Sequence, residues 1–331
     1  MKKVSVSFFF LIIIFILSFF YILNNNQKPL IYEEKYYKFG TLVSIKISES
    51  ANKSKEEIKT IFDKVANLLD ELHIKWHPWE ENPKNILYNL NKALQNGNSY
   101  KVDNDTLNII KTSKYVAKIT NNLFNPLNGK LYEIWGFHKE DFSKNKVPDQ
   151  KIIDKIVSAK LTMDNIKIDK NIISTNIKDP KIRKLIKLDF NAIAKGQIIL
   201  NIKALLRSNN IENALINIGG DIYAMGYRDS KNKTNWTSAI FNPDDNNKPI
   251  KIIKLKPNTA IATSGNYFRN FKIDNNNYHH IINGFNGKPN NKIKQATVID
   301  DNPLIADALT TTILLSDKFS KKMNKSKYYI L

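Results

Sequence analysis

The 331-residue sequence contains no cysteine. The protein therefore has no disulfide bond, no thiol nucleophile and no thiolate ligand for a metal. Any metal ion must be held by oxygen or nitrogen atoms. If the chain is exported, its stability must come from packing alone.

Arginine is almost as scarce, since it accounts for four of the 51 basic residues. The lysines are scattered among asparagine and isoleucine, whereas nucleic-acid-binding proteins more often cluster arginine with aromatic residues. We therefore expect no nucleic-acid partner despite the net charge of +20. A positive field still attracts anionic ligands such as phosphates or anionic lipid head groups.

Charge is absent from residues 4–23, which follow Lys2 and Lys3. Twenty helical residues span roughly 30 Å, the thickness of the hydrocarbon core of a bilayer. No small-residue cleavage site follows this segment. We predict a retained membrane anchor over residues 1–23, with a cleaved signal peptide as the alternative. The lysines favour a cytoplasmic N-terminus, which places the rest of the chain on the extracytoplasmic (periplasmic) face of the cytoplasmic membrane.

Residues 24–35 are predicted to be a linker, and residues 36–331 are long enough for one large domain. Residues 40–47 alternate apolar and polar side chains as a half-buried strand does. A capping box at Ser54–Glu57 predicts a long amphipathic helix, and a second helix is expected from about Asp105 to Thr120.

The second half of the chain has short apolar runs separated by glycine, asparagine and aspartate. Together with the helices, these runs indicate an α+β fold and not a doubly wound parallel sheet. Strands are predicted at residues 214–218, 222–227, 237–241, 252–255 and 260–263, and helices near residues 197–208 and 303–316. Residues 139–187 have weak periodicity and are interpreted as a variable insertion without chemistry.

A possible cation site lies in the last predicted helix. Asn302 is a favourable N-cap and Pro303 suits the first helical position, so Asp307 and Thr311 share one helix face. Mg²⁺ prefers such oxygen ligands and usually shares them with a substrate phosphate. Each residue also has an ordinary structural interpretation, in which the aspartate favours the helix dipole and the threonine bonds to a carbonyl group.

Two further stretches are compatible with phosphate chemistry. Asp189 to Gly196 leads into a helix, where free N–H groups and Lys195 suit an anion, although a solvated loop is the simpler interpretation. His280, in the pair His279-His280, can transfer a proton beside a phosphate, but a single histidine is more often structural. The glycine pair at residues 219–220 is sufficiently explained by a hairpin.

In the order and amino-acid sequence of these motifs, the protein resembles the FAD:protein FMN transferases, which form the ApbE family of flavin transferases. The resemblance extends from about residue 37 to residue 315. The matching stretches are Phe39-Gly40-Thr41, residues 124–129 with Leu131 and residues 135–137, Leu188-Asp189 with residues 192–196, residues 217–221, residues 262–267, His280 with residues 287–289, and residues 306–311.

The resemblance implies a T-fold-like arrangement with mixed or antiparallel sheets, and a set of site residues. The family's Mg²⁺ is held by the Ala192 carbonyl group and the side chains of Asp307 and Thr311. An aromatic position after the first helix, for which Trp79 is the candidate, also contacts flavin. The implied FAD contacts are Phe39, Asn125, Pro126, Leu127, Asp189, Lys195 and Ile282.

The reaction that the resemblance implies transfers FMN from FAD to a threonine hydroxyl group of an acceptor protein and releases AMP. His280 is the first candidate for the proton transfer, and Asp189 is the second. The expected acceptors are exported flavoproteins or subunits of membrane redox pumps. A FAD pyrophosphatase and a non-catalytic FAD-binding protein of the same fold remain alternatives. A third is a protein that binds a membrane surface or nucleic acid through its basic charge.

Three positions depart from the family pattern. Phe39 stands where many relatives have methionine, Asn125 where aspartate is common, and Asn283-Gly284 where Asp-Pro is common. None of these changes removes an implied metal ligand. The asparagine lacks the charge of aspartate, and the glycine leaves the loop after His280 less constrained.

Overall fold

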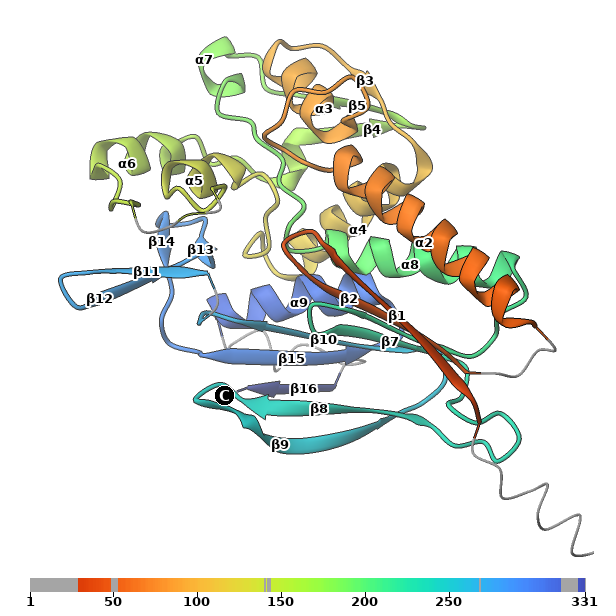
Figure 1. Ribbon diagram of the computed structural model, residues 1–331. Coiled ribbons are helices and arrows are strands. Elements are labelled where there is room, and N and C mark those ends of the chain that lie inside the picture. The colour runs from red at the N-terminus through yellow and green to blue at the C-terminus, as the bar shows by residue number, and fades with distance from the viewer. Residues whose placement is uncertain are drawn as a thin grey trace, which may run out of the picture.

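The computed structural model describes residues 29–48, 53–139, 141, 144–267, 269–316 and 327–330 (Figure 1). The predicted anchor at residues 1–23, and residues 24–28 of the predicted linker, lie outside this part of the chain. Among the residues described, no helix is both long enough and apolar enough to cross a bilayer.

The largest element is an antiparallel sheet of seven strands in the spatial order β1-β2-β6-β7-β10-β15-β16. Hairpins connect β1 to β2 and β6 to β7, and both turns lie at the same end of the sheet as the last residues of β10. The strand bounds are Ile31–Lys38 (β1), Thr41–Ser48 (β2), Ala214–Ile218 (β6), Asp221–Met225 (β7), Thr259–Gly265 (β10), Gln295–Asp300 (β15) and Lys327–Ile330 (β16).

Helices cover one face of this sheet (Figure 1). Helix α9 (Pro303–Leu315) packs on β10 and β15, and it is buried along most of its length. Helices α8 (Ala194–Ser208), α2 (Lys55–Lys75) and α4 (Asn104–Ile119) pack around it and around one another. Apolar side chains from these helices and from β2, β6 and β15 form the main core.

The opposite face of the sheet is covered by a hairpin of β8 (Trp236–Asn242) and β9 (Asp245–Leu255). Trp236, Ile240 and Leu255 pack there against Ile261 and neighbouring residues of the sheet. The sheet is therefore buried on both faces.

The remaining elements form two groups above the helices (Figure 1). In one group, α3 (Ile86–Gln95) and α7 (Pro180–Arg183) accompany a small sheet of β3 (Tyr100–Lys101), β5 (Ile172–Thr175) and β4 (Ile166–Asp169), with η1 (Met163–Asn165) before β4. The other group has a small aromatic core. Its elements are α5 (Gly129–Ile134), α6 (Gln150–Ser158), and the strand pairs β11 (Asn270–Ile273) with β12 (Asn276–His279) and β13 (Ile282–Asn283) with β14 (Lys288–Pro289).

The predicted α+β class is confirmed, and so are the main helices and strands. The capping box at Ser54–Glu57 is present, and Asn302 accepts a hydrogen bond from the Leu304 N–H group at the start of α9. The chain between residues 139 and 187, which was interpreted as a variable insertion, forms α6, η1, β4, β5 and α7. The predicted linker is too long at its end, since β1 already begins at Ile31.

Helices α8 and α9 lie very close to each other at Gly196. A Cβ atom at this position would lie 2.5 Å from the backbone Cα of Leu304. Only glycine therefore allows this approach without a shift of one helix. The close approach brings Lys195, on α8, to the side of α9 that carries Asp307.

Substitution Gly196→Ala should push α8 and α9 apart. We expect the free energy of unfolding to fall by about 1–3 kcal/mol, as is usual when a tightly packed contact is overfilled. Ser208→Ala, at the exposed end of the same helix, should change it by less than about 0.5 kcal/mol. Urea unfolding of residues 25–331 measures both, and equal stabilities of the two variants would contradict the packing argument.

Candidate active site

A cavity of about 440 Å³ opens at the end of the large sheet, on the face that carries the helices. Its walls come from the β1–β2 turn, the end of α2, the start of α8, one side of α9 and the loops around β13. Every site residue predicted from the sequence lines this cavity except Leu127.

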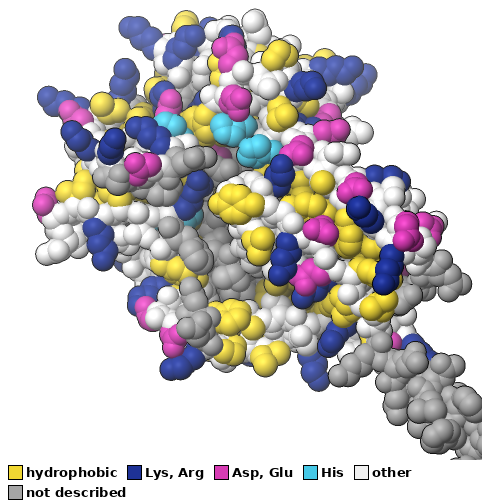
Figure 2. Space-filling model, in the orientation of Figure 1, with side chains coloured by type: hydrophobic (Ala, Val, Ile, Leu, Met, Phe, Trp, Pro, Cys, Tyr) yellow, Lys and Arg dark blue, Asp and Glu magenta, His cyan; other side chains and the backbone are white. Residues whose placement is uncertain are grey.

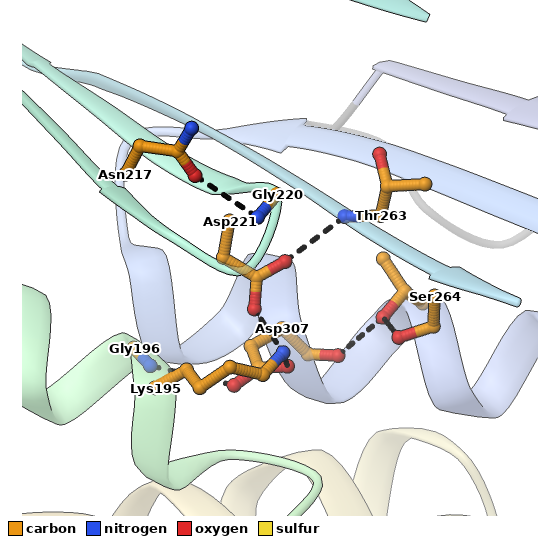
Figure 3. Close-up of polar contacts among 9 residues, drawn as sticks. Lys195, Gly196, Asn217, Gly220, Asp221, Thr263, Ser264 and Asp307 are labelled. Atoms are coloured by element: carbon orange, nitrogen blue, oxygen red, sulfur yellow. Dashed lines mark hydrogen bonds and ion pairs between the residues drawn. The ribbon is translucent and has the colours of Figure 1, made fainter. Parts of the chain in front are cut away.

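The deepest charged feature is a cluster of Lys195, Asp221 and Asp307, which come from α8, β7 and α9 (Figure 3). The Lys195 ammonium group is 3.2 Å from Asp307 Oδ1 and also donates to Asp221 Oδ2. The two carboxylates are almost fully buried, with 2% and 1% of their side chains exposed. Backbone N–H groups complete the cluster, because Thr263 donates to Asp221 at 3.1 Å and Gly196 donates to Asp307 at 3.3 Å.

Local sequence explains how these groups are positioned. Gly219 and Gly220 have φ values of 58° and 96°, which allow the tight two-residue turn that starts β7 at Asp221. The Gly220 N–H group donates to Asn217 Oδ1 at 2.9 Å and stabilises this turn. Helix α8 begins without a side-chain cap, so its Gly196 N–H group is available to Asp307.

The charges in the cluster do not balance. Burial alone would lower the pKa of Lys195, but Asp221 and Asp307 outweigh this effect and raise it. Burial raises the pKa of Asp307 to about 7, with Lys195 opposing the rise and Asp221 adding to it. One ammonium group thus faces two carboxylates, and the cluster has room for further positive charge.

The chemistry of the donors fits a hard cation. Thr311 lies one helical turn after Asp307 and lines the same cavity, as does Ala192. No group of three or more histidine, cysteine or acidic side chains within the described ranges can hold a metal by itself. A cation at Asp307 would therefore have one carboxylate and neutral oxygens as protein ligands, which is the arrangement that Mg²⁺ uses when a substrate phosphate completes its coordination.

His280 lies in the wall of the cavity and forms an edge contact with Phe137. Its Nδ1 atom is 3.3 Å from the Arg269 carbonyl oxygen, which can only accept a hydrogen bond. The proton is therefore assigned to Nδ1, which leaves Nε2 free to accept one. Burial, followed by the charge of Arg269, lowers the pKa of His280 to about 3, so the ring is neutral at physiological pH.

Asp189 is the second acidic group that lines the cavity wall. Its carboxylate accepts hydrogen bonds from the backbone and side-chain N–H groups of Asn191, at 2.8 and 3.2 Å. Burial raises the pKa of Asp189 to about 6, against the effects of Asn191 and Arg269. Most of the group is therefore ionised at pH 7, and it remains the second candidate for the proton acceptor.

Aromatic side chains form the apolar part of the cavity. Trp79 stacks on Tyr132, with ring centroids 6.3 Å apart, and the Lys187 ammonium group lies over the Trp79 ring, 4.4 Å from its centroid. Phe39 occupies the β1–β2 turn with a φ of 58°, a conformation that is uncommon for a bulky residue. Four of the five histidines also line the cavity, and Figure 2 shows histidine side chains gathered on one face of the molecule.

Two predicted FAD contacts have structural roles. Leu127 is 2% exposed and belongs to the main core, so its side chain does not reach the cavity. Asn125 lines the cavity, but its amide donates to the Leu161 carbonyl group at 2.7 Å and its Oδ1 accepts from the Leu127 N–H group. An aspartate could not make the first of these bonds, which explains why an amide is suitable here.

Three residues of the site were not predicted from the sequence, namely Asp221, Arg269 and Tyr132. Asp221 follows a glycine pair that was explained by its turn alone, although it lay in a matching motif. Arg269 is one of only four arginines, and that rarity was the available signal. No local sequence pattern marks Tyr132 as a site residue. Its position depends on stacking against Trp79 and on a hydrogen bond that its hydroxyl group accepts from Arg269 at 3.1 Å.

Comparisons with known proteins support one family. A sequence model of the ApbE family matches residues 39–328. The chain is 28% identical over 284 residues to an FAD:protein FMN transferase of Rhodobacter capsulatus, which covers 86% of this chain and 51% of that protein. It is 27% identical over 261 residues to an FAD:protein FMN transferase of Vibrio cholerae, covering 78% of this chain and 73% of the other. The chain thus spans about half the length of the first of these relatives.

Solved structures show the same fold. The ApbE protein of Thermotoga maritima superposes with a TM-score of 0.77 at 25% identity, covering 91% of this chain and 94% of the other. The flavin transferase ApbE of Vibrio cholerae gives a TM-score of 0.73 at 24% identity, covering 91% and 97%. The sheet order and helical layer described above are therefore shared with both.

The raised pKa of Asp307 predicts a pH-dependent stability in the absence of metal. A folded-state pKa near 7, above the usual 3.8, means that the folded protein binds more protons. The contribution of protonated Asp307 to the free energy of unfolding is therefore fully present below about pH 4 and is lost as the pH rises to about 7. We expect the stability difference between wild type and Asp307→Asn to fall by on the order of 3 kcal/mol between pH 4 and pH 8. Urea unfolding in EDTA measures it, and a difference independent of pH would contradict the assignment.

Proposed function

Since the chain belongs to the ApbE family, we propose that it transfers the FMN part of FAD to a threonine hydroxyl group of an acceptor flavoprotein and releases AMP. The observation that carries this proposal is that Lys195 and Asp307, which form a buried cluster with Asp221, line the same cavity as His280. A pyrophosphate needs positive charge, and Arg269 lines the same cavity.

Asp307, Thr311 and the carbonyl group of Ala192 would hold Mg²⁺. When bound, the cation supplies positive charge to the pyrophosphate of FAD and favours attack at phosphorus. Lys195 and Arg269 supply further positive charge to the same cavity, and the stacked Trp79 and Tyr132 offer an apolar surface to a flat ring system.

His280 is the proposed proton acceptor. Nε2 takes the proton of the acceptor hydroxyl group, whose oxygen forms a bond to the FMN phosphorus, while the bond from that phosphorus to the bridging oxygen breaks and AMP leaves. The negative charge of a bound pyrophosphate would counteract the effect of Arg269 and raise the low pKa of the ring toward a useful range. Asp189 remains the second candidate for this role.

We further propose that the reaction takes place at the extracytoplasmic face of the membrane, with residues 1–23 as the anchor. The uncharged stretch of residues 4–23 supports this location. The acceptor would then face the same compartment, as exported flavoproteins and subunits of membrane redox pumps do.

The intact mass of an acceptor domain tests the transfer. Incubation with FAD, Mg²⁺ and residues 25–331 should add the mass of FMN to the acceptor, less one water. Asp307→Ala should abolish the adduct, and His280→Ala should slow it about 100-fold or more while FAD still binds. Asp189→Asn is the comparison for the second candidate base.

Each other outcome has a defined meaning. FMN and AMP in solution without any adduct would indicate a FAD pyrophosphatase. Tight binding of FAD that stays intact would indicate a non-catalytic FAD-binding protein. Near-normal transfer by folded His280→Ala would refute the assignment of the base.

A further inference from the structure

His279 is buried completely, next to the proposed base, and its ring makes two hydrogen bonds in opposite directions. Its Nδ1 atom accepts from the Ile281 N–H group at 3.1 Å, and its Nε2 atom lies 3.0 Å from the Asn290 carbonyl oxygen. Because an N–H group can only donate and a carbonyl can only accept, both bonds require the same tautomer, with the proton on Nε2. The ring thus links the two ends of the β13–β14 hairpin.

Asn290 continues this connection to α9. Its side-chain amide donates to the carbonyl oxygens of Leu314 and Leu315, at 2.9 and 2.8 Å. These carbonyls belong to the last turn of the helix, where no intrahelical partner is available. A continuous chain of hydrogen bonds therefore leads from the C-terminal end of α9, through Asn290 and His279, to the backbone beside His280.

This series of hydrogen bonds connects the cation-binding residues on α9 with the proposed base His280. Asp307 and Thr311 lie on α9, and Leu315 at its end also lines the cavity. His280 is held between the two residues that the chain fixes, His279 and Ile281, while its own N–H group and Nδ1 both face the Arg269 carbonyl group. The position of the ring relative to α9 is thus determined from both sides.

We propose that His279 is a positioning residue, which acts through Asn290 to set the place of His280 relative to Asp307 and Thr311. This inference rests on the proposed function, because it holds that the buried ring of His279 determines the distance between the proposed base and the proposed cation-binding residues. A small displacement of a reacting group can reduce turnover about 100-fold without weakening the binding of the substrate.

Two substitutions separate the two hydrogen bonds of the ring. In His279→Asn the amide oxygen takes the place of Nδ1, so it keeps the local bond from Ile281 but is too short to reach Asn290. In His279→Gln the amide nitrogen takes the place of Nε2 and keeps the link to Asn290. Asn213→Ala is a matched control, because it removes a buried hydrogen bond, from the Tyr227 N–H group at 2.8 Å, at the opposite end of the sheet.

The full-length enzyme, with FAD and an acceptor domain, provides the kinetic test. We expect His279→Asn to lower kcat about 10- to 100-fold, with the KM for FAD changed less than about 2-fold. His279→Gln should stay within about 3-fold of wild type, and so should Asn213→Ala. Adding Asn290→Ala to His279→Asn should cost little more, because the chain is already interrupted.

The inference is overturned if His279→Asn turns over like Asn213→Ala, or if its kcat per folded molecule is unchanged. A crystal structure of His279→Asn tests the position directly and without any activity. We expect the His280 ring to move relative to Thr311, and a ring that stays in place would contradict the proposal. A wild-type enzyme that forms no adduct would instead refute the proposed transfer.

Discussion

The buried contact of one ammonium group with two carboxylates joins the parts of the chain that form the cavity. Lys195, Asp221 and Asp307 lie on α8, β7 and α9, which are far apart in the sequence. Burying such charges costs several kcal/mol for each ion, and apolar residues of similar volume would often be at least as stable. The cluster is therefore poorly explained by stability alone, and its excess of negative charge is better explained as a place for a cation.

The remaining features of the site follow from the surroundings of this cluster. Gly196 allows α8 to approach α9, and its N–H group donates to Asp307 at 3.3 Å. Burial, followed by the charge of Arg269, keeps His280 neutral in the free protein. Trp79 stacks on Tyr132, whose hydroxyl group accepts a hydrogen bond from Arg269, so a surface suited to a ring system lies next to a positive charge in the same cavity.

The sequence predicted well what is determined locally. The capping box before α2, Asn302-Pro303 before α9 and the glycine pair before β7 each dictate backbone geometry within a few residues. It predicted poorly what depends on distant partners. The role of Asp221 arises from Lys195 on another element, and Leu127 points into the core although its neighbours in the motif line the cavity. Strand β1 was not predicted because its exposed edge carries charges in place of an apolar alternation.

The central claim is that a cation and the phosphates of FAD share the end of the cavity beside Asp307 and Thr311. Anomalous diffraction from crystals grown with FAD and Mn²⁺, in place of Mg²⁺, tests it most directly. The account predicts one strong peak within coordination distance of the Asp307 carboxylate, the Thr311 hydroxyl group and a phosphate oxygen, and no such peak in Asp307→Asn. Bound FAD with no peak at this position, or with the peak unchanged in the variant, would contradict it.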